Sequence, residues 1–347
     1  MIATKGYAAQ NSTDPLAPYN FQRRELRTND VQIEIQYCGV CHSDLHTVRD
    51  EWGGTIYPVV PGHEIVGRVT RVGADVKKFK QGQTVGVGCL VGSCMKCNNC
   101  REGLEQYCEN GWIGTYNGQE EGSSLPTYGG YSNFIIVGEH FVLSISDKLP
   151  IEGVAPLLCA GITTYSPLRH WNVGNGHKVG VIGLGGLGHM AVKFAAAFGA
   201  EVTMLSTSPE KEKDAKSLGA HHFALTKDPA SVSKLKNHFD FIVDTVSAAH
   251  DYNLFLKLLK TNGVMICVGA PPTPTEIQGM NLIHNRLSLS GSLIGGLPET
   301  QEMLDYCAEH NIVSDVEMID MASINTAYER MLKGDVKYRF VIDMATL

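Results

Sequence analysis

Four closely spaced cysteines are the part of this sequence whose residue types and spacing most clearly indicate chemistry. Cys94, Cys97, Cys100 and Cys108 follow the pattern C-x2-C-x2-C-x7-C. Four thiolates can complete a tetrahedral shell around zinc, which is typical of a structural site. The bacterial iron–sulfur run is the alternative, but its fourth cysteine follows three intervening residues and precedes proline. Here seven residues intervene and Glu109 follows, so the spacing favours zinc.

A second set of possible metal ligands lies around this cluster in the sequence. It consists of Cys41, His63, Glu64 and Cys159. A mixed set of thiolate, imidazole and carboxylate ligands with one labile position suits a catalytic metal. Together the two sets predict an enzyme with two zinc ions per chain, one structural and one catalytic.

The segment from Cys38 to His42 permits two other interpretations. It matches the C-x-x-C-H form of c-type haem attachment, and its two cysteines could also form a redox pair. Haem attachment belongs to exported proteins, and the first residues show no basic segment followed by an apolar stretch. Because His63 and Glu64 give Cys41 a better use as a metal ligand, Cys38 is most simply a small buried apolar residue.

Length and composition limit the classes of protein to which the chain can belong. It has 347 residues, more than the roughly 250–300 that one hydrophobic core supports, so we expect two domains. A net charge of −7 argues against a nucleic-acid partner, and no apolar run approaches the ~18 residues of a membrane span. In a reducing compartment, clustered cysteines indicate metal ligands and not disulfides. We therefore expect a cytoplasmic protein that acts on a small molecule.

Hydrophobic periodicity divides the chain into two structural types. Residues 31–37 alternate apolar and polar side chains, as a half-buried strand does, and similar segments run through residues 134–144. From about Cys159 onward, apolar runs without alternation precede helix-period segments, which predicts a parallel sheet covered on both faces. These runs are Lys178–Ile182, Val202–Leu205, Phe241–Val246 and Val264–Gly269. Because Val336–Asp343 could return to the first domain as a strand, the parallel-sheet domain would be an insertion.

A glycine-rich turn follows the first of these runs. Residues 183–188 read G-L-G-G-L-G, and apolar residues recur at helical spacing from Leu187 to Phe198. In a strand–turn–helix of this kind the glycines allow the tight turn, the close approach of a pyrophosphate and the packing of helix on strand. The alternative is a glycine-rich packing turn without a ligand. The predicted dinucleotide contacts are Gly183, Gly185, Gly186, Leu187 and Gly188.

The residues that follow the second strand indicate which dinucleotide binds. An NAD site usually has a carboxylate about 20 residues past the turn, where it binds the ribose hydroxyls. This chain instead has Ser206, Thr207 and Ser208, followed by Lys211, and hydroxyls with a lysine suit a 2′-phosphate. The sequence therefore favours NADP(H). A solvated loop and helix cap is the alternative, since Glu210 adds an opposing charge.

Several motifs occur in an order that resembles the zinc-containing medium-chain alcohol dehydrogenases over nearly the whole chain. They are Gly39–Asp44, Gly62–Gly67 with Gly73 and Val76, the four-cysteine segment, the 183–188 turn and Gly295-Gly296. Residues 37–46, 159–165 and 206–208 are similar to the cinnamyl alcohol dehydrogenase branch, whose members are typically NADP-dependent. The resemblance implies an α/β fold in which a Rossmann domain with a doubly wound parallel sheet, residues 158–294, is inserted in a β-rich GroES-like catalytic domain. Residues 1–157 and 295–347 would form that catalytic domain.

The resemblance also implies roles for the residues around the catalytic metal. Cys41, His63 and Cys159 would bind zinc, with Glu64 a fourth ligand or close by, and the metal would polarise an aldehyde oxygen. Asp44 would hold the His63 ring, or else cap a local turn. A proton relay would run through Ser43 and His46, although His46 could be an ordinary surface histidine.

The same resemblance extends to cofactor and substrate contacts. His42 and Arg339 would lie near the cofactor pyrophosphate, although either could be an ordinary surface cation. Further cofactor contacts would come from Thr163, Val268 and Ser292. Trp52 and Trp112 are candidates for an aromatic substrate pocket, with burial in the core as the alternative.

These observations predict an NADP(H)-dependent zinc alcohol dehydrogenase that reduces aromatic or medium aliphatic aldehydes to primary alcohols. Three alternatives remain: a polyol dehydrogenase of the same fold, a relative that oxidises the thiol adduct of formaldehyde, and a nonenzymatic NADP-binding zinc protein. The intact Cys41, His63 and Cys159 set argues against the last. The strand-like segment 287–294 could pair with a second copy across a two-fold axis, so we also expect a homodimer.

Overall fold

The computed structural model describes residues 1–120, 122–271 and 273–347, and leaves Glu121 and Pro272 outside the description. The chain divides into two compact units. Unit 1 comprises Met1–Ile162 and Gly295–Leu347, and unit 2 comprises Thr163–Ile294. This division assigns residues 158–162, including Cys159, to unit 1, whereas the sequence analysis began the cofactor domain at residue 158.

A seven-stranded sheet forms the framework of unit 1. Its strands are arranged in the order β16-β17-β3-β4-β5-β9, and β8 pairs with β3 outside that path. In β3 the side chains of Val31, Ile33 and Ile35 are buried while Glu34 is exposed, which confirms the predicted alternation. The sheet strands are β3 (Asp30–Gly39), β4 (Ile65–Val72), β5 (Thr84–Val87), β8 (Phe134–Gly138), β9 (Leu143–Ser144), β16 (Val316–Asp320) and β17 (Arg339–Asp343).

The C-terminal strand closes unit 1. In β17, Val341, Ile342 and Asp343 pair antiparallel with Gly39, Cys38 and Tyr37 of β3. The last part of the chain therefore returns to the first domain, as the sequence analysis proposed. Two smaller pairs of strands complete the β-structure: β1 (Ile2–Ala8) with β2 (Ala17–Arg23), and β6 (Leu90–Gly92) with β7 (Ile113–Gly114).

Helices pack around the strands of unit 1. In α11 the buried residues are Ile324, Ala327, Tyr328 and Met331, a spacing that places them on one helical face. In α10, Pro298 lies in the first turn and Asn311 ends the helix in the left-handed conformation. The helices are α1 (His42–Val48), α2 (Asn98–Arg101), α3 (Ile151–Val154), α10 (Leu297–His310) and α11 (Ile324–Leu332), with α4 (Ala160–His170) crossing into unit 2.

Unit 2 is a six-stranded parallel sheet. In the order β12-β11-β10-β13-β14-β15, the second and third strands of the unit lie on one side of its first strand, β10, and the last three lie on the other side. This is the doubly wound Rossmann order, and it confirms the predicted fold class. The strands are β10 (Lys178–Ile182), β11 (Glu201–Ser206), β12 (His222–Leu225), β13 (Phe239–Asp244), β14 (Leu259–Cys267) and β15 (Ser288–Gly291).

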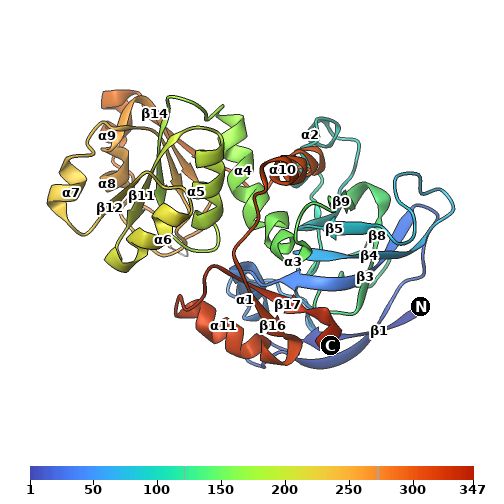
Figure 1. Cartoon of the computed structure of the whole chain (residues 1–347). Helices are drawn as coiled ribbons and strands as arrows, with labels where there is room; N and C mark the ends of the chain where they lie inside the picture. Colours follow the sequence, from blue (N-terminus) through green and yellow to red (C-terminus); the bar gives the residue numbers. More distant parts are fainter. Residues whose placement is uncertain (121, 272) are drawn as a thin grey trace. The chain divides into compact units, whose positions relative to one another are not determined.

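Helices cover both faces of this sheet, with α5 on one side and α8 and α9 on the other (Figure 1). The apolar stripe predicted after the glycine turn is buried at Met190, Ala191, Phe194 and Ala195. The opposite face has a core that includes Phe239, Ile242, Phe255 and Leu256. The helices are α5 (Gly188–Ala197), α6 (Glu212–Ser217), α7 (Pro229–Ser233), α8 (Tyr252–Leu256) and α9 (Gly279–Asn285).

Within the described part of the chain, every helix is too short or too polar to cross a membrane.

Candidate active site and cofactor site

The four ligands predicted for the catalytic metal meet in unit 1. Cys41 directly precedes α1, His63 and Glu64 directly precede β4, and Cys159 lies between a short 3-10 helix and α4. One ligand atom from each of these residues lies within 4.8 Å of the others, and the two Sγ atoms are 4.0 Å apart. The fold therefore assembles one cluster from three separate segments of the chain.

The thiols in this cluster have opposite pKa shifts. The hydrogen bond with Cys159 and the positive charge of Arg339 lower the pKa of Cys41 well below its ordinary value, against the effect of burial. The same hydrogen bond, a second one with Cys89 and burial raise the pKa of Cys159. Two cysteines this close readily form a thiol–thiolate pair that shares one proton, and a divalent cation would replace that proton with a charge that stabilises both thiolates.

Asp44 forms hydrogen bonds that orient two of these ligands, Cys41 and His63. Its Oδ1 accepts hydrogen bonds from the Gly62 backbone N–H and lies 3.0 Å from His63 Nδ1. Its Oδ2 accepts from the Cys41 backbone N–H and from the Tyr131 hydroxyl, at 2.9 and 3.3 Å. Burial lowers the pKa of His63, but the charges of Asp44 and Cys89 and the hydrogen bonds with Asp44 and Cys41 together raise that pKa well above its ordinary value. Because Nδ1 faces Asp44, His63 presents Nε2 as its metal-binding atom.

Glu64 is buried beside a guanidinium. Its Oε1 accepts a hydrogen bond from Arg339 Nη2, which also donates to the Val40 carbonyl oxygen at 2.9 Å. Burial raises the pKa of Glu64 to about 7, although the charge of Arg339 opposes this shift. Arg339 is therefore not an ordinary surface cation. The sequence analysis missed this ion pair, because the two residues lie 275 positions apart.

The residues present fit a zinc ion. Two thiols, an imidazole and a carboxylate are a donor set that zinc prefers, and among the described residues Glu64 Oε2 is buried without a hydrogen-bond partner. Gly39 leaves the room for this oxygen, since a Cβ at residue 39 would lie 1.9 Å from it. When bound, the metal would supply a Lewis acid that polarises a carbonyl oxygen.

The residues proposed for proton transfer lie on α1. Ser43 and His46 are three positions apart and so share a face of the helix, and Ser43 Oγ is 3.7 Å from Cys41 Sγ. His46 Nδ1 contacts the carboxylate of Glu51, a residue that the sequence analysis did not single out. The sequence did offer one sign of this contact, because Glu51 lies only five positions after His46. Glu51 can fix the orientation of the His46 ring.

Neither candidate pocket tryptophan is buried in the core. Trp52 is 59% exposed and its ring lies 5.0 Å from the His46 ring, and Trp112 is 38% exposed. Another aromatic ring is closer to the ligands: the Tyr116 ring centroid is 5.6 Å from that of His63. Burial raises the pKa of Tyr116 well above its usual value, so its hydroxyl stays protonated.

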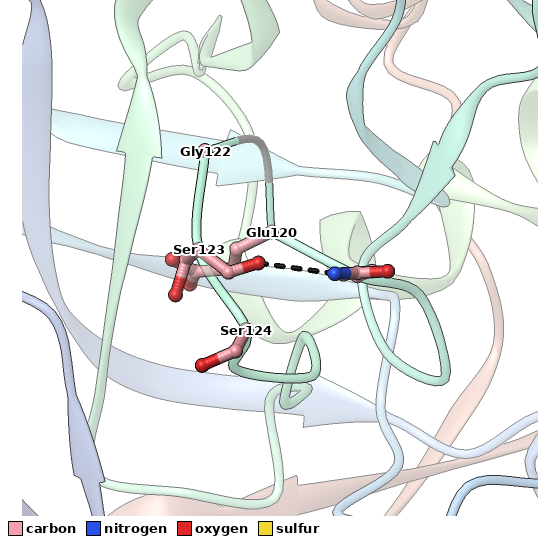
Figure 2. Close-up of a pocket in the computed structure, with 5 residues that line it drawn as sticks. Glu120, Gly122, Ser123 and Ser124 are labelled. Carbon is pink, nitrogen blue, oxygen red and sulfur yellow. Dashed lines mark hydrogen bonds between the residues drawn. The ribbon is translucent and has the colours of Figure 1, made fainter.

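A surface hollow on the polar loop that follows Tyr116 contains none of the predicted site residues. Gln119, Glu120, Gly122, Ser123 and Ser124 line it, and Gln119 Nε2 donates to the Ser123 carbonyl oxygen at 3.1 Å (Figure 2). The described residues that line the hollow are therefore different from the predicted site residues.

The four-cysteine cluster is a separate site built within one loop. Ligand atoms of Cys94, Cys97, Cys100 and Cys108 lie within 4.8 Å of one another. Backbone N–H groups of this loop already point at sulfur: Cys97 N donates to Cys94 Sγ at 3.3 Å and Cys94 N to Cys108 Sγ at 3.4 Å. Such hydrogen bonds, led by one from Lys96, lower the pKa of Cys94 to about 6. Four thiols and no other ligand type suit a closed structural zinc site.

The glycine turn in unit 2 fits a dinucleotide. Gly183 has φ +85°, and a Cβ at Gly188 would lie 1.9 Å from the Gly183 carbonyl oxygen, so both positions require glycine. A Cβ at Gly185 would meet no atom within 4 Å, which leaves open space where a pyrophosphate would approach. Gly186 and Leu187 complete the turn before α5.

The predicted 2′-phosphate residues lie beside this turn. Ser206 ends β11 and its Oγ accepts a hydrogen bond from the Ser208 backbone N–H at 3.2 Å. Thr207 is exposed. Lys211 Nζ donates to the Leu184 carbonyl oxygen at 3.0 Å, so the lysine reaches back to the glycine turn. Serine and threonine hydroxyls and the Lys211 ammonium group thus lie next to the glycine turn, and such groups can bind a phosphate.

The remaining predicted contacts are dispersed. Val268 N donates to the Asp244 carbonyl oxygen at 2.9 Å and Ser292 N to the Cys267 carbonyl oxygen at 3.2 Å, both at the carboxyl edge of the sheet. Thr163 is buried in α4. His42 is exposed at the start of α1 in unit 1.

Comparison with known proteins relates the chain to one group of enzymes. A family model described as an alcohol dehydrogenase GroES-like domain matches residues 27–147, and one described as a zinc-binding dehydrogenase matches residues 186–309. The chain is 54% identical to NADP-dependent alcohol dehydrogenase C 1 of Mycolicibacterium smegmatis, over 100% of this chain and 99% of that protein. It is 55% identical to aldehyde reductase YahK of Escherichia coli, over 99% of each chain.

A solved structure also resembles the chain closely. This is the cinnamyl alcohol dehydrogenase from Helicobacter pylori complexed with NADP(H), with a TM-score of 0.93 and 44% identity over 99% of each chain.

Proposed function

The chain belongs to the zinc-binding alcohol dehydrogenase family with a GroES-like domain, and from this membership we propose that it is an NADP(H)-dependent aldehyde reductase. It would transfer hydride between NADPH and aromatic or medium aliphatic aldehydes to give primary alcohols. The observation that carries the proposal is the cluster of Cys41, His63, Glu64 and Cys159 around one point. This donor set, unlike the four-cysteine set, includes an exchangeable carboxylate ligand.

Two features support NADP(H) as the cofactor. The segment after β11 has hydroxyls and Lys211 where an NAD site would have a carboxylate. The relatives named above as an NADP-dependent enzyme and as an NADP(H) complex share 54% and 44% of their residues with this chain. The nicotinamide would supply the hydride, and Ser206, Thr207 and Lys211 would hold the adenosine end.

Side chains of α1 would transfer the proton that the reduction requires. Ser43 and His46 share a face of α1, and Glu51 contacts His46 Nδ1. During reduction an alkoxide must gain a proton, and the Ser43 hydroxyl would donate it and be resupplied from His46. Asp44 would keep Nε2 of His63 directed at the metal throughout.

Two further properties belong to this proposal. In unit 2, β15 is the last strand of its sheet, and Leu289, Leu293 and Ile283 near it are exposed, with Ile283 at 70%. An exposed apolar sheet edge supports a homodimer formed through β15, and a monomer in light scattering at working concentration would contradict it. The ten free cysteines support a cytoplasmic location.

The decisive assay follows NADPH oxidation with cinnamaldehyde, benzaldehyde and a short aliphatic aldehyde, repeated with NADH and after zinc removal. We expect zinc-dependent turnover with NADPH. Turnover of sorbitol, or of formaldehyde only with added thiol, would instead favour the related dehydrogenases, and no turnover with two bound zincs would favour a binding protein.

A substitution tests the cofactor assignment separately. Thr207→Asp should shift the ratio of kcat/KM values toward NADH, because a carboxylate repels the 2′-phosphate and can accept ribose hydroxyls. Thr207→Asn, similar in size and uncharged, is the matched control. An unchanged cofactor ratio in Thr207→Asp would contradict the assignment.

A further inference from the structure

A buried carboxylate and a histidine form a pair at the end of β13, outside the residues assigned so far. Asp244 is 0% exposed, and its Oδ2 lies 3.0 Å from Nε2 of His250, whose side chain is 17% exposed. The other oxygen of Asp244 accepts a hydrogen bond from the Val246 backbone N–H at 3.1 Å. A buried carboxylate needs such partners, because an unpaired charge in the interior is costly.

Both ring nitrogens of His250 face hydrogen-bond acceptors. Nε2 faces the Asp244 carboxylate, and Nδ1 lies 2.8 Å from the Ala248 carbonyl oxygen. A neutral imidazole has only one N–H, so it can donate to one of these partners, whereas the imidazolium donates to both. Two acceptors placed in this way therefore favour the charged form of the ring.

The segment held by this pair, residues 245–250, buttresses the glycine turn. Thr245 Oγ1 donates to the Ile182 carbonyl oxygen at 2.7 Å and lies 3.1 Å from that of Gly183. A Cβ at Gly183 would lie 2.6 Å from Cγ2 of Val246, so these two segments of the chain are in close contact. A shift of this segment would therefore move the first glycine of the turn.

The segment is also packed against the end of the next strand. A Cβ at Gly269 would lie 2.4 Å from the Val246 carbonyl oxygen. The Asp244 carbonyl oxygen accepts from the backbone N–H groups of Val268 and Gly269, at 2.9 and 3.0 Å. Residues 245–250 thus lie between two backbone segments at the carboxyl edge of the sheet, where nucleotides bind in this fold.

The surroundings of His250 favour a charged ring. On its own segment it faces Asp244 and Asp251, and the rings of Tyr252 and Phe255 of α8 lie 4.9 and 5.8 Å away. His250 and Glu276 both line a surface pocket of about 190 Å³, which gives protons access to the His250 ring. Behind Asp244, on β14, burial raises the pKa of Cys267 to about 11, so this thiol adds no charge. The hydrogen bond with Asp244 raises the pKa of His250.

We infer that His250 is a positioning residue for the dinucleotide: as an imidazolium bound to Asp244 and Ala248, it holds residues 245–250 against the glycine turn. The inference rests on the proposed function, because it requires that the turn binds NADP(H). His250 itself need not touch the cofactor, since it acts through Thr245 and Val246.

This role makes cofactor affinity depend on pH with a defined sign. The folded-state pKa of His250 lies above the ordinary value, so the stabilisation is complete below that ordinary value and is lost as pH rises through the folded pKa. Loss of the proton removes one of the two hydrogen bonds and loosens the segment. Affinity for NADP⁺ should therefore weaken toward alkaline pH.

The test measures NADP⁺ binding to the full-length, zinc-loaded protein by calorimetry, from about pH 5.5 to about pH 9, across the histidine range. His250→Phe removes both hydrogen bonds and should raise the Kd about tenfold near neutral pH, the equivalent of about 1.4 kcal/mol. His250→Gln keeps a donor toward Asp244 that does not titrate, so it should restore most of the affinity and remove the pH dependence. Titration of the nucleotide is common to all variants and cancels in the ratio of Kd values.

The matched control is His222→Phe. His222 pairs with Glu201 at 3.1 Å on the same sheet, but at the amino ends of the strands and on the surface. It should leave the Kd unchanged. If His250→Phe lowers the melting temperature but binds NADP⁺ as wild type does at every pH, the residue is only structural and the inference is wrong. If His250→Phe does not fold, an unaltered pH profile in His250→Gln overturns it equally. A wild-type protein that binds no NADP⁺ would instead contradict the proposed function.

Discussion

The two metal-ligand clusters of unit 1 both contain cysteines but are built in different ways. Cys94, Cys97, Cys100 and Cys108 come from one short loop, whose own backbone N–H groups donate to the sulfur atoms. The other site draws Cys41, His63, Glu64 and Cys159 from three segments that the seven-stranded sheet and its connections bring together. A loop can close a metal site by itself, whereas a site that must admit a substrate is assembled and supported by the fold.

The supporting residues show the same contrast. In the site assembled from three segments (Cys41, His63, Glu64 and Cys159; the assembled site), Asp44 orients His63 and Cys41, and Arg339 holds Glu64. These groups are charged and buried, and so their geometry depends on long-range packing. Among the residues that the structure describes, the four-cysteine site (the loop site) is supported by hydrogen bonds from its own backbone and not by buried charged side chains. We therefore expect substitutions at the assembled site to affect turnover, and substitutions at the loop site to affect stability.

The largest effect on turnover should come from Cys159→Ser. It removes one ligand of the assembled site, so the protein should retain one zinc of two. Loss of the Lewis acid costs several kcal/mol in the transition state, which predicts a fall in kcat of at least about a thousandfold. Metal analysis and steady-state kinetics check this, with Cys307→Ala as a control that should retain both zincs. Full turnover in Cys159→Ser would refute the assignment of this cluster.

A smaller loss should follow Asp44→Asn. The amide cannot accept all the hydrogen bonds that the carboxylate accepts from Cys41, Gly62 and Tyr131 and shares with His63. Loss of such a supporting group typically costs about 10–100-fold in metal affinity or activity. Competition with a chelator gives the zinc affinity. Tyr131→Phe removes the 3.3 Å contact with Asp44 and leaves that carboxylate's contacts with Cys41, Gly62 and His63, so it should have a smaller effect. An equal effect would mean that Asp44 does not act through His63.

Gly39→Ala tests whether Glu64 needs its space. The new Cβ would lie 1.9 Å from Oε2 of Glu64, so the carboxylate must move. We expect kcat to fall about tenfold, at the lower end of the effect of altered supporting groups. Gly138→Ala is the control, since a Cβ there meets nothing within 4 Å. Equal kcat values in the two variants would show that the position of Glu64 does not matter to turnover.

The smallest effect on turnover should come from Cys97→Ala, even though its effect on stability is large. It opens the loop site, so one zinc is lost and the melting temperature should fall by about 10 °C, roughly 3 kcal/mol. Turnover per remaining zinc, measured well below the new melting temperature, should stay within about twofold of wild type. A loss of turnover as large as in Cys159→Ser would end the distinction between the two sites.

Local patterns in the sequence determined much of this protein. The spacing of Cys94 to Cys108 identified a closed metal site, because ligands within one loop are brought together by the loop itself. Strand and helix periodicity predicted β3, β10 and the buried face of α5, because side-chain direction repeats with the backbone geometry of each element. The glycine turn was readable because Gly183 and Gly188 occupy positions that require glycine.

Only the tertiary structure decided which distant charged groups meet. The pairing of Arg339 with Glu64 spans 275 residues and follows from the position of β17 beside β3. The two acceptors that face His250 depend on how residues 245–250 turn after β13, which no period in the sequence encodes. The physical reason is that periodicity reports which face of an element is buried, whereas a buried ion pair depends on the packing of separate elements against one another.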